Sequence, residues 1–284
     1  MFDFRYHALS LVAVFLALMV GLLLGVAIGD QGLVSGAERN LRQSLRAEVR
    51  AAQADADSKS RQLAEERRFQ DAVYPLLVAN RLAGKRVGLV GVGGLSDSAI
   101  REVRDGLQGT GGQLAGVAVV HEPVPATAVE QVPGASSPPA AGDYGKLGAA
   151  LATALLRGGP QARTLVRLLL ESSSGNLAGA QGVVVWRAPR NPGAPDEANT
   201  NAFESGLASG LSANAGQVVG AENTDTAPSQ IPWYRASRLS SVDDLDRVAG
   251  KAAMVFVLAG ANGAFGIKDT AQALLPDAAP APAG

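Results

Sequence analysis

The strongest constraint on this chain is an uncharged apolar run near its N-terminus, from Ala8 to Gly29. A helix of that length covers roughly 33 Å, which is enough to cross the hydrocarbon core of a bilayer. A cleaved signal peptide is the alternative, because Ala27, Ile28 and Gly29 resemble a small-x-small cleavage site. The run is longer than the apolar region of a typical signal peptide. We therefore expect residues 1–30 to form an uncleaved transmembrane anchor.

Small residues recur every four positions along this predicted helix. In lipid, a ridge of small side chains lets the backbone of another helix approach closely. The spacing therefore predicts self-association or packing against a partner helix, although glycine and alanine are common in membrane helices generally. The ridge consists of Ala13, Ala17, Gly21, Gly25 and Gly29.

The charges that flank the apolar run give only a weak indication of orientation. Arg5 precedes the run, whereas Arg39, Arg42 and Arg46 follow it. By the positive-inside rule, this distribution weakly favours a cytoplasmic C-terminal part.

Residues 31–84 are expected to form a helical stalk. Alanine and arginine, both strong helix formers, are frequent here, and no glycine or proline occurs between Ala37 and Tyr74. Lys59 and Glu66 interrupt a strict heptad, so a coiled coil is one interpretation and a simple spacer is the other. Pro75 is expected to end or kink the helix. The predicted partner face consists of Leu41, Leu45, Val49, Ala52, Ala56 and Leu63.

The pattern from residue 85 to residue 276 predicts an α/β domain. Aliphatic runs at 87–92, 114–120, 182–186 and 217–220 read as strands, and residues 252–259 read as either a strand or a helix. This alternation favours a mainly parallel, three-layer domain of flavodoxin-like or Rossmann-like type. Residues 277–284 are expected to form a disordered tail. Helices are expected at 98–108, 147–156, 162–171 and 200–211, and irregular loops at 122–143, 187–199 and 221–232.

The turn after the first predicted strand raises the question of a nucleotide site. Gly91, Gly93 and Gly94 precede a helix, and Glu122 follows the next strand, where a ribose-binding acid could lie. The third glycine of the dinucleotide fingerprint is replaced by Ser96. Asp97 would place a negative charge where a pyrophosphate binds, and we interpret it as the N-cap of the helix. We expect no cofactor at this turn.

Composition excludes several classes of site. The chain has no cysteine, two histidines and three methionines, so it lacks thiolates and offers few soft metal ligands. His121 has no evident triad partner, and we expect neither an enzyme nor a metal centre. A net charge of −1 gives no electrostatic support for nucleic-acid binding.

The N-terminal sequence, from Phe2 to Gly25, closely resembles the start of the actinobacterial MctB family, often called copper transport protein B. Shorter similarities occur at residues 242–244, 250–251, 263–266 and 274–276. The resemblance implies a single-pass protein of the cytoplasmic membrane, with its N-terminus inside and its stalk and domain outside in the envelope. It also implies copper transport for the family, and a role in cell separation for corynebacterial relatives called SteB.

From these observations we expect a non-enzymatic, membrane-anchored adaptor. It would bind an envelope protein through the stalk, for example a peptidoglycan hydrolase that it positions or activates in cell separation. The first alternative is a component of copper transport or homeostasis, acting as an oligomer; copper enters only through the family resemblance. The second alternative is a sensor of small molecules outside the cytoplasm.

Overall fold

The protein is described by a computed structural model, which covers residues 4–29, 33–130, 132, 135–159, 162–190 and 196–277. The chain divides into two compact units, Met1–Arg68 and Phe69–Gly284. The first holds one helix and most of a second, and the other is an α/β unit. The expected domain boundaries at residues 30, 84 and 276 stay predictions. The expected tail lies outside the described residues, apart from Asp277.

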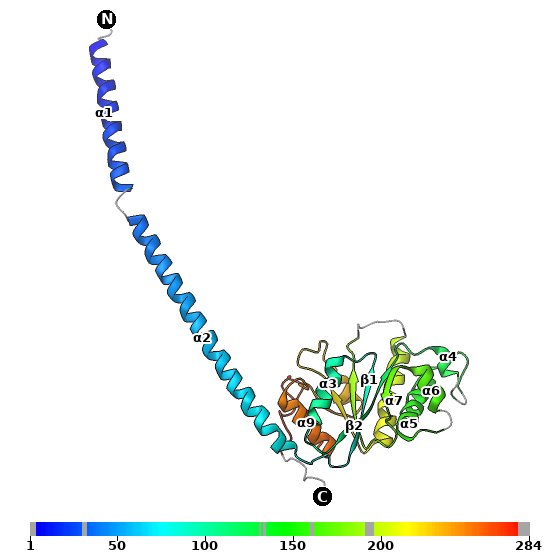
Figure 1. The fold of residues 1–284 in the computed structure, drawn as a ribbon. Helices are drawn as coiled ribbons and strands as arrows, with labels where there is room; N and C mark the ends of the chain where they lie inside the picture. The colour runs from blue at the N-terminus through cyan, green and yellow to red at the C-terminus, as the bar shows by residue number, and fades with distance from the viewer. Residues whose placement is uncertain are drawn as a thin grey trace. The chain divides into compact units, whose positions relative to one another are not determined.

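Two long helices begin the chain (Figure 1). Helix α1 (Phe4–Gly29) contains the apolar run, and helix α2 (Leu33–Val78) spans 46 residues. Of the two alternatives for Pro75, the end of the helix was wrong, because α2 continues to Val78, and a kink at Pro75 stays a prediction. Proline removes one backbone donor from a helix. Val78 ends the turn that follows Pro75, and its burial in the core of the α/β unit helps to stabilise that turn.

A seven-stranded sheet forms the centre of the second unit, in the order β3-β2-β1-β4-β5-β6-β7. All neighbouring pairs are parallel except β2 and β3, so the predicted α/β class with a mainly parallel sheet is confirmed. The strands are β1 (Arg86–Val92), β2 (Gln113–Val120), β3 (Leu170–Gly175), β4 (Gly182–Arg187), β5 (Gln217–Ala221), β6 (Ser240–Val242) and β7 (Ala264–Phe265).

Helices cover the two faces of this sheet (Figure 1). Because successive side chains of a strand point to opposite faces, β1 contributes Val90 and Val92 to one core cluster and Val87 and Leu89 to the other. The first cluster includes α4 (Ala126–Val129), α5 (Ala141–Arg157), α6 (Ala162–Leu169), α7 (Glu197–Asn214) and α8 (Ile231–Ala236). The second includes α3 (Asp97–Gly106) and α9 (Val248–Ala259).

Three local expectations need correction. The predicted helix at 162–171 ends at Leu169, because residues 170–175 pair with β2 as an antiparallel strand. The expected loop at 122–143 contains α4 and the start of α5, because Ala128 and Val129 are buried in the core. The N-cap of α3 is Ser96, whose Oγ accepts a hydrogen bond from the backbone of Ala99, and Asp97 lies in the first turn.

The ambiguous stretch at 252–259 belongs to helix α9. Its side chains from Ala252 to Leu258 are all buried, which explains why the sequence shows no amphipathic period there. Strands β6 and β7 and helix α8 were not predicted, since β6 and β7 have only three and two residues and the six residues of α8 are fewer than two helical turns.

Candidate functional site

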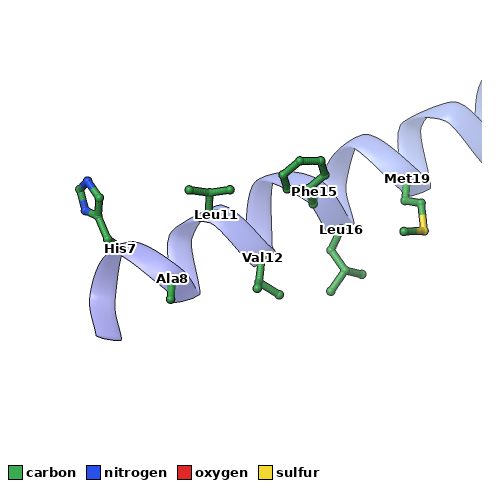
Figure 2. Close-up of a pocket in the computed structure, with 7 residues that line it drawn as sticks. All are labelled: His7, Ala8, Leu11, Val12, Phe15, Leu16 and Met19. Atoms are coloured by element: carbon green, nitrogen blue, oxygen red, sulfur yellow. The ribbon is translucent and has the colours of Figure 1, made fainter. Parts of the chain in front are cut away.

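Helix α1 is apolar on every described side. Residues Arg5–Ala27 form the one described helix that is long and apolar enough to cross a membrane, and none of their apolar side chains is buried against the protein. Figure 2 shows His7, Leu11 and Phe15 along one side of α1 and Val12 and Leu16 along another, with a shallow hollow of the helix surface between them. Such a surface is costly in water and favourable in lipid.

The predicted small-residue ridge lies on α1. Ala13 and Ala17 are exposed, and a Cβ atom added to Gly21 or Gly25 would meet no atom within 4 Å. Gly29 is the last residue of α1. The first four residues of the ridge are therefore accessible to another helix, and the role of the ridge in packing stays a prediction.

The predicted partner face of α2 is exposed along its whole length. Leu41, Leu45, Val49 and Leu63 are each more than half exposed, and Ala52 and Ala56 are exposed as well. Lys59, which interrupts the heptad, forms an exposed ion pair of 2.8 Å with Asp55 one turn earlier. An isolated helix with a row of exposed leucines gains little from burial, so this face is suited to a partner.

The C-terminal end of α2 belongs to the α/β unit. The hydroxyl of Tyr74 donates a hydrogen bond of 2.6 Å to the carbonyl of Gly106, at the end of α3. Val78 and Leu82 are fully buried in the core cluster that includes α3 and α9, and the Arg81 guanidinium lies 5.1 Å from the ring centre of Phe256. Burial raises the pKa of the Tyr74 hydroxyl well above its usual value, so it stays a donor.

The carboxyl edge of the parallel strands carries a concentration of charged side chains. In open α/β sheets this edge is the usual place for ligands. Glu122 follows β2, Arg187 ends β4, Glu222 follows β5 and Asp243 follows β6. Of these four residues, only Glu122 was predicted from the sequence as a possible ligand-binding acid, and Asp243 entered only through the family resemblance at residues 242–244. Arg187 and Glu222 each follow an aliphatic run, at 182–186 and 217–221. Asp243 follows only Ser240, Ser241 and Val242, so no comparable pattern marks it.

Glu122 fills the glycine turn that resembles a nucleotide-binding loop. A Cβ atom on Gly93 would lie 2.8 Å from Oε2 of Glu122, so the carboxyl group occupies the space beside the turn. Its side chain is only 7% exposed, and Oε1 has no hydrogen-bond partner among the described residues. Burial, reinforced by Glu204, raises the pKa of Glu122 above the usual carboxyl range, and Arg190 partly offsets this.

Glu204 of α7 is the centre of a buried ion-pair network. Arg187 donates from Nε to Glu204 Oε1 at 2.9 Å and from Nη2 to Oε2 at 3.1 Å, which is a bidentate pair. Arg190 adds a hydrogen bond of 3.0 Å to Glu204 and lies 3.7 Å from Glu122. Arg187 also donates to Gln230 and lies over the ring of Trp233. Glu204, Arg187 and Arg190 pair with one another in this network, and the geometry fits a structural role.

A second group of charges joins the loops after β5, β6 and β7. The Lys268 ammonium donates to Glu222 at 2.6 Å and to the carbonyls of Asn223 and Thr226. The Asp243 carboxylate accepts hydrogen bonds from the backbone of Ile267 and Lys268. These contacts fix the loop that follows β7 against the edge of the sheet.

Asp244 differs from these residues because neither of its carboxyl oxygens has a hydrogen-bond partner among the described residues. The residue is fully buried, and Gly250 of α9 lies close to its Oδ1. Burial, followed by the charge of Asp243, raises the pKa of Asp244 to about 6.

The soft ligand candidates are dispersed. His121 is exposed after β2, where its backbone donates to the carbonyl of Leu169, and His7 lies on α1. Met19 also lies on α1, whereas Met254 is buried within α9. Within the described ranges, no three His, Cys, Asp or Glu side chains form a group able to hold a metal ion.

Comparison with known proteins identifies the family. No curated protein matches the sequence. The model of the family described as "Copper transport outer membrane protein, MctB" matches residues 1–276, which include α1, α2 and the whole α/β sheet. Since that match covers nearly all of the sequence, the chain belongs to the MctB family.

Proposed function

We propose that this chain is a non-enzymatic, membrane-anchored component of copper transport, which acts through a protein partner on the exposed face of α2. The family description supports the process, and the exposed apolar surface of α1 supports the anchor. One membrane helix cannot enclose a pathway for an ion, so transport requires further copies or another protein. The observation that carries the partner is the row of exposed apolar residues on α2.

We also propose the finer architecture and topology. The α/β unit is a three-layer, Rossmann-like domain, supported by its two core clusters, and α2 is the stalk that carries it. The chain crosses the cytoplasmic membrane once, with the N-terminus inside and the domain in the envelope. Because the chain has no cysteine, Ala236→Cys gives a single exposed thiol. A membrane-impermeant maleimide should label it in intact cells, and labelling only after lysis would contradict this topology.

The second candidate function is an adaptor that positions or activates an envelope enzyme, such as a peptidoglycan hydrolase, in cell separation. It rests on the same exposed face of α2 and does not involve copper. Deletion of the chain distinguishes the two functions. Copper transport predicts altered cellular copper with normal separation, and the adaptor predicts chained cells with normal copper.

A small-molecule sensor is the third candidate. Its expected position is the glycine turn, where Glu122 now lies against Gly93. If a nucleotide bound there, it would raise the unfolding temperature of the chain. If no nucleotide in a panel changed the unfolding temperature, this function would be excluded.

A further inference from the structure

Strand β3 forms one edge of the sheet and is largely exposed. It pairs with β2 on one side, and residues 171–175 are all exposed. An exposed edge presents backbone donors and acceptors to which another strand can add.

The backbone N–H and C=O groups of Ser173 point away from β2. Asn176 donates to the carbonyl of Ala115, which makes Gly116 and Gly175 a pair that exchanges no hydrogen bonds. Such pairs alternate with hydrogen-bonded pairs along an antiparallel ladder. Ala118 and Ser173 lie two positions further along the ladder, so they too form a pair that exchanges no hydrogen bonds. The N–H and C=O groups of Ser173 consequently face outward, where an added strand would lie.

A hollow of about 250 Å³ lies beside the inner face of β3. Ala118 and Ser173 both line it, so a residue placed opposite Ser173 on an added strand would point toward the same hollow. Aliphatic side chains provide most of the remaining wall, including Leu155, Val166 and Leu177. The hollow is therefore suited to one aliphatic side chain of an incoming segment.

The rim of this hollow is positively charged. Arg163 of α6 lines the hollow, and Arg167 lies one turn further along the same face of α6. Both arginines are exposed, and no acidic side chain is among the described residues that line the hollow. Charge complementarity favours an acidic segment.

We propose that β3 is a docking site for an extended acidic segment of a partner protein, which adds as a strand beside Ser173 and places one aliphatic side chain in the hollow. The register shift opposite Val119 and Val120 leaves Glu171 without a paired residue. A bulge of this kind limits pairing at that end of an edge strand. The site therefore accepts a short segment, and it uses none of the residues of the α2 partner face.

The test uses the full chain in detergent and a fluorescent probe peptide, acetyl-Thr-Asp-Thr-Leu-Thr-Asp-Thr-amide. Its leucine and both aspartates share one face of the strand, and a second peptide carries lysine in place of aspartate. We expect the acidic peptide to bind at least tenfold more tightly than the lysine peptide. Arg163→Glu should abolish or reverse that preference.

Ser173→Pro is the decisive variant, because proline removes the outward N–H and is tolerated where an edge strand faces solvent. Ser173→Ala keeps the N–H and serves as its matched control. We expect at least a tenfold loss of peptide binding with proline and little change with alanine.

Equal binding of the acidic peptide by Ser173→Pro and Ser173→Ala, or equal binding of the acidic and lysine peptides by the natural chain, would overturn the proposal. A wild-type dimer that Ser173→Pro converts into a monomer would also overturn it, because a second copy would then occupy the edge. If Ser173→Pro does not fold, the proposal is tested by Arg163→Glu alone, and an unchanged preference of that variant for the acidic peptide would overturn it.

Discussion

The hydroxyl of Tyr74 in α2 donates a hydrogen bond of 2.6 Å to the carbonyl of Gly106 at the end of α3. Together with the buried Val78 and Leu82, this contact makes the end of α2 part of the folded core. A partner that holds α2 near this end would therefore be coupled to the α/β unit through packed side chains rather than through a loose linker.

Tyr74→Phe should lower the free energy of unfolding of the α/β unit by about 1 kcal/mol, because it removes one hydrogen bond and leaves the Gly106 carbonyl without its donor. Urea unfolding of the full chain measures this loss. Tyr144→Phe is the control, since the Tyr144 side chain is buried but no hydrogen bond of its hydroxyl occurs among the described contacts. Equal effects of the two substitutions would refute the specific role of the Tyr74 contact.

Glu204→Gln should destabilise the fold by about 3 kcal/mol, because it removes the carboxylate that neutralises two largely buried arginines. The side chain of Glu204 is fully buried, and Arg187 is 11% exposed. Asp55→Asn breaks the exposed pair with Lys59 and should cost less than about 0.5 kcal/mol. Denaturant midpoints of the two variants test the contrast, and a Glu204→Gln effect as small as that of Asp55→Asn would show that the network contributes little.

Asp244→Asn should stabilise the protein at neutral pH. The pKa of Asp244 in the folded chain is about 6, above its usual value of 3.8, so the folded state loses stability as the pH rises from about 4 to about 6. Above pH 6 the carboxylate is ionised in both states, and the full penalty of about 3 kcal/mol applies. The variant should therefore show little of this loss when unfolding is followed at pH 4, 5, 6 and 8.

The exposed Asp269→Asn is the control for this pH series, and its profile should match that of the natural chain. If the dependence of stability on pH in Asp244→Asn also matched that of the natural chain, the raised pKa of Asp244 would be contradicted.

Gly148→Ala should destabilise the packing of α5 against α7. A Cβ atom at this position would collide with the carbonyl oxygen of Phe203 and would lie 2.7 Å from the backbone nitrogen of Leu207. Overpacking of this kind costs about 1–3 kcal/mol. Gly142, also in α5, has open space at its Cβ position, so Gly142→Ala should be neutral or slightly stabilising. Thermal unfolding measures the stability of both variants. An unchanged unfolding temperature in Gly148→Ala would mean that α5 and α7 can move apart without loss of stability.

The sequence predicted four central strands because each is a continuous aliphatic run buried on both faces, as Val183 to Val185 in β4 illustrate. It did not predict β3, whose Ser172, Ser173 and Ser174 are not among the β-branched and aromatic residues that favour strands. This strand is held by pairing with β2, which is a long-range contact that local pattern does not reveal.

The charged network at the carboxyl edge could not be predicted from the sequence either. Glu204 lies within a helix and its partner Arg187 ends a strand, so only the parallel topology brings them together. By contrast, helical periodicity alone determines which residues share a face, so the ridge on α1 and the apolar row on α2 could be defined from the sequence, and their roles in packing and partner binding stay predictions.

The most direct test of the proposed function measures cellular copper by mass spectrometry in cells that lack the chain and in cells that carry variants of α2. Leu45→Glu with Val49→Glu places charges on the exposed apolar face, whereas Ala47→Glu with Ala51→Glu places the same residues about half a turn away on exposed positions. We expect deletion to change cellular copper at least twofold. The first variant should reproduce the deletion while present in the membrane, and the second should restore normal copper. Unchanged copper in the deletion strain would contradict the account, and equal behaviour of the two variants would contradict the role of the α2 face.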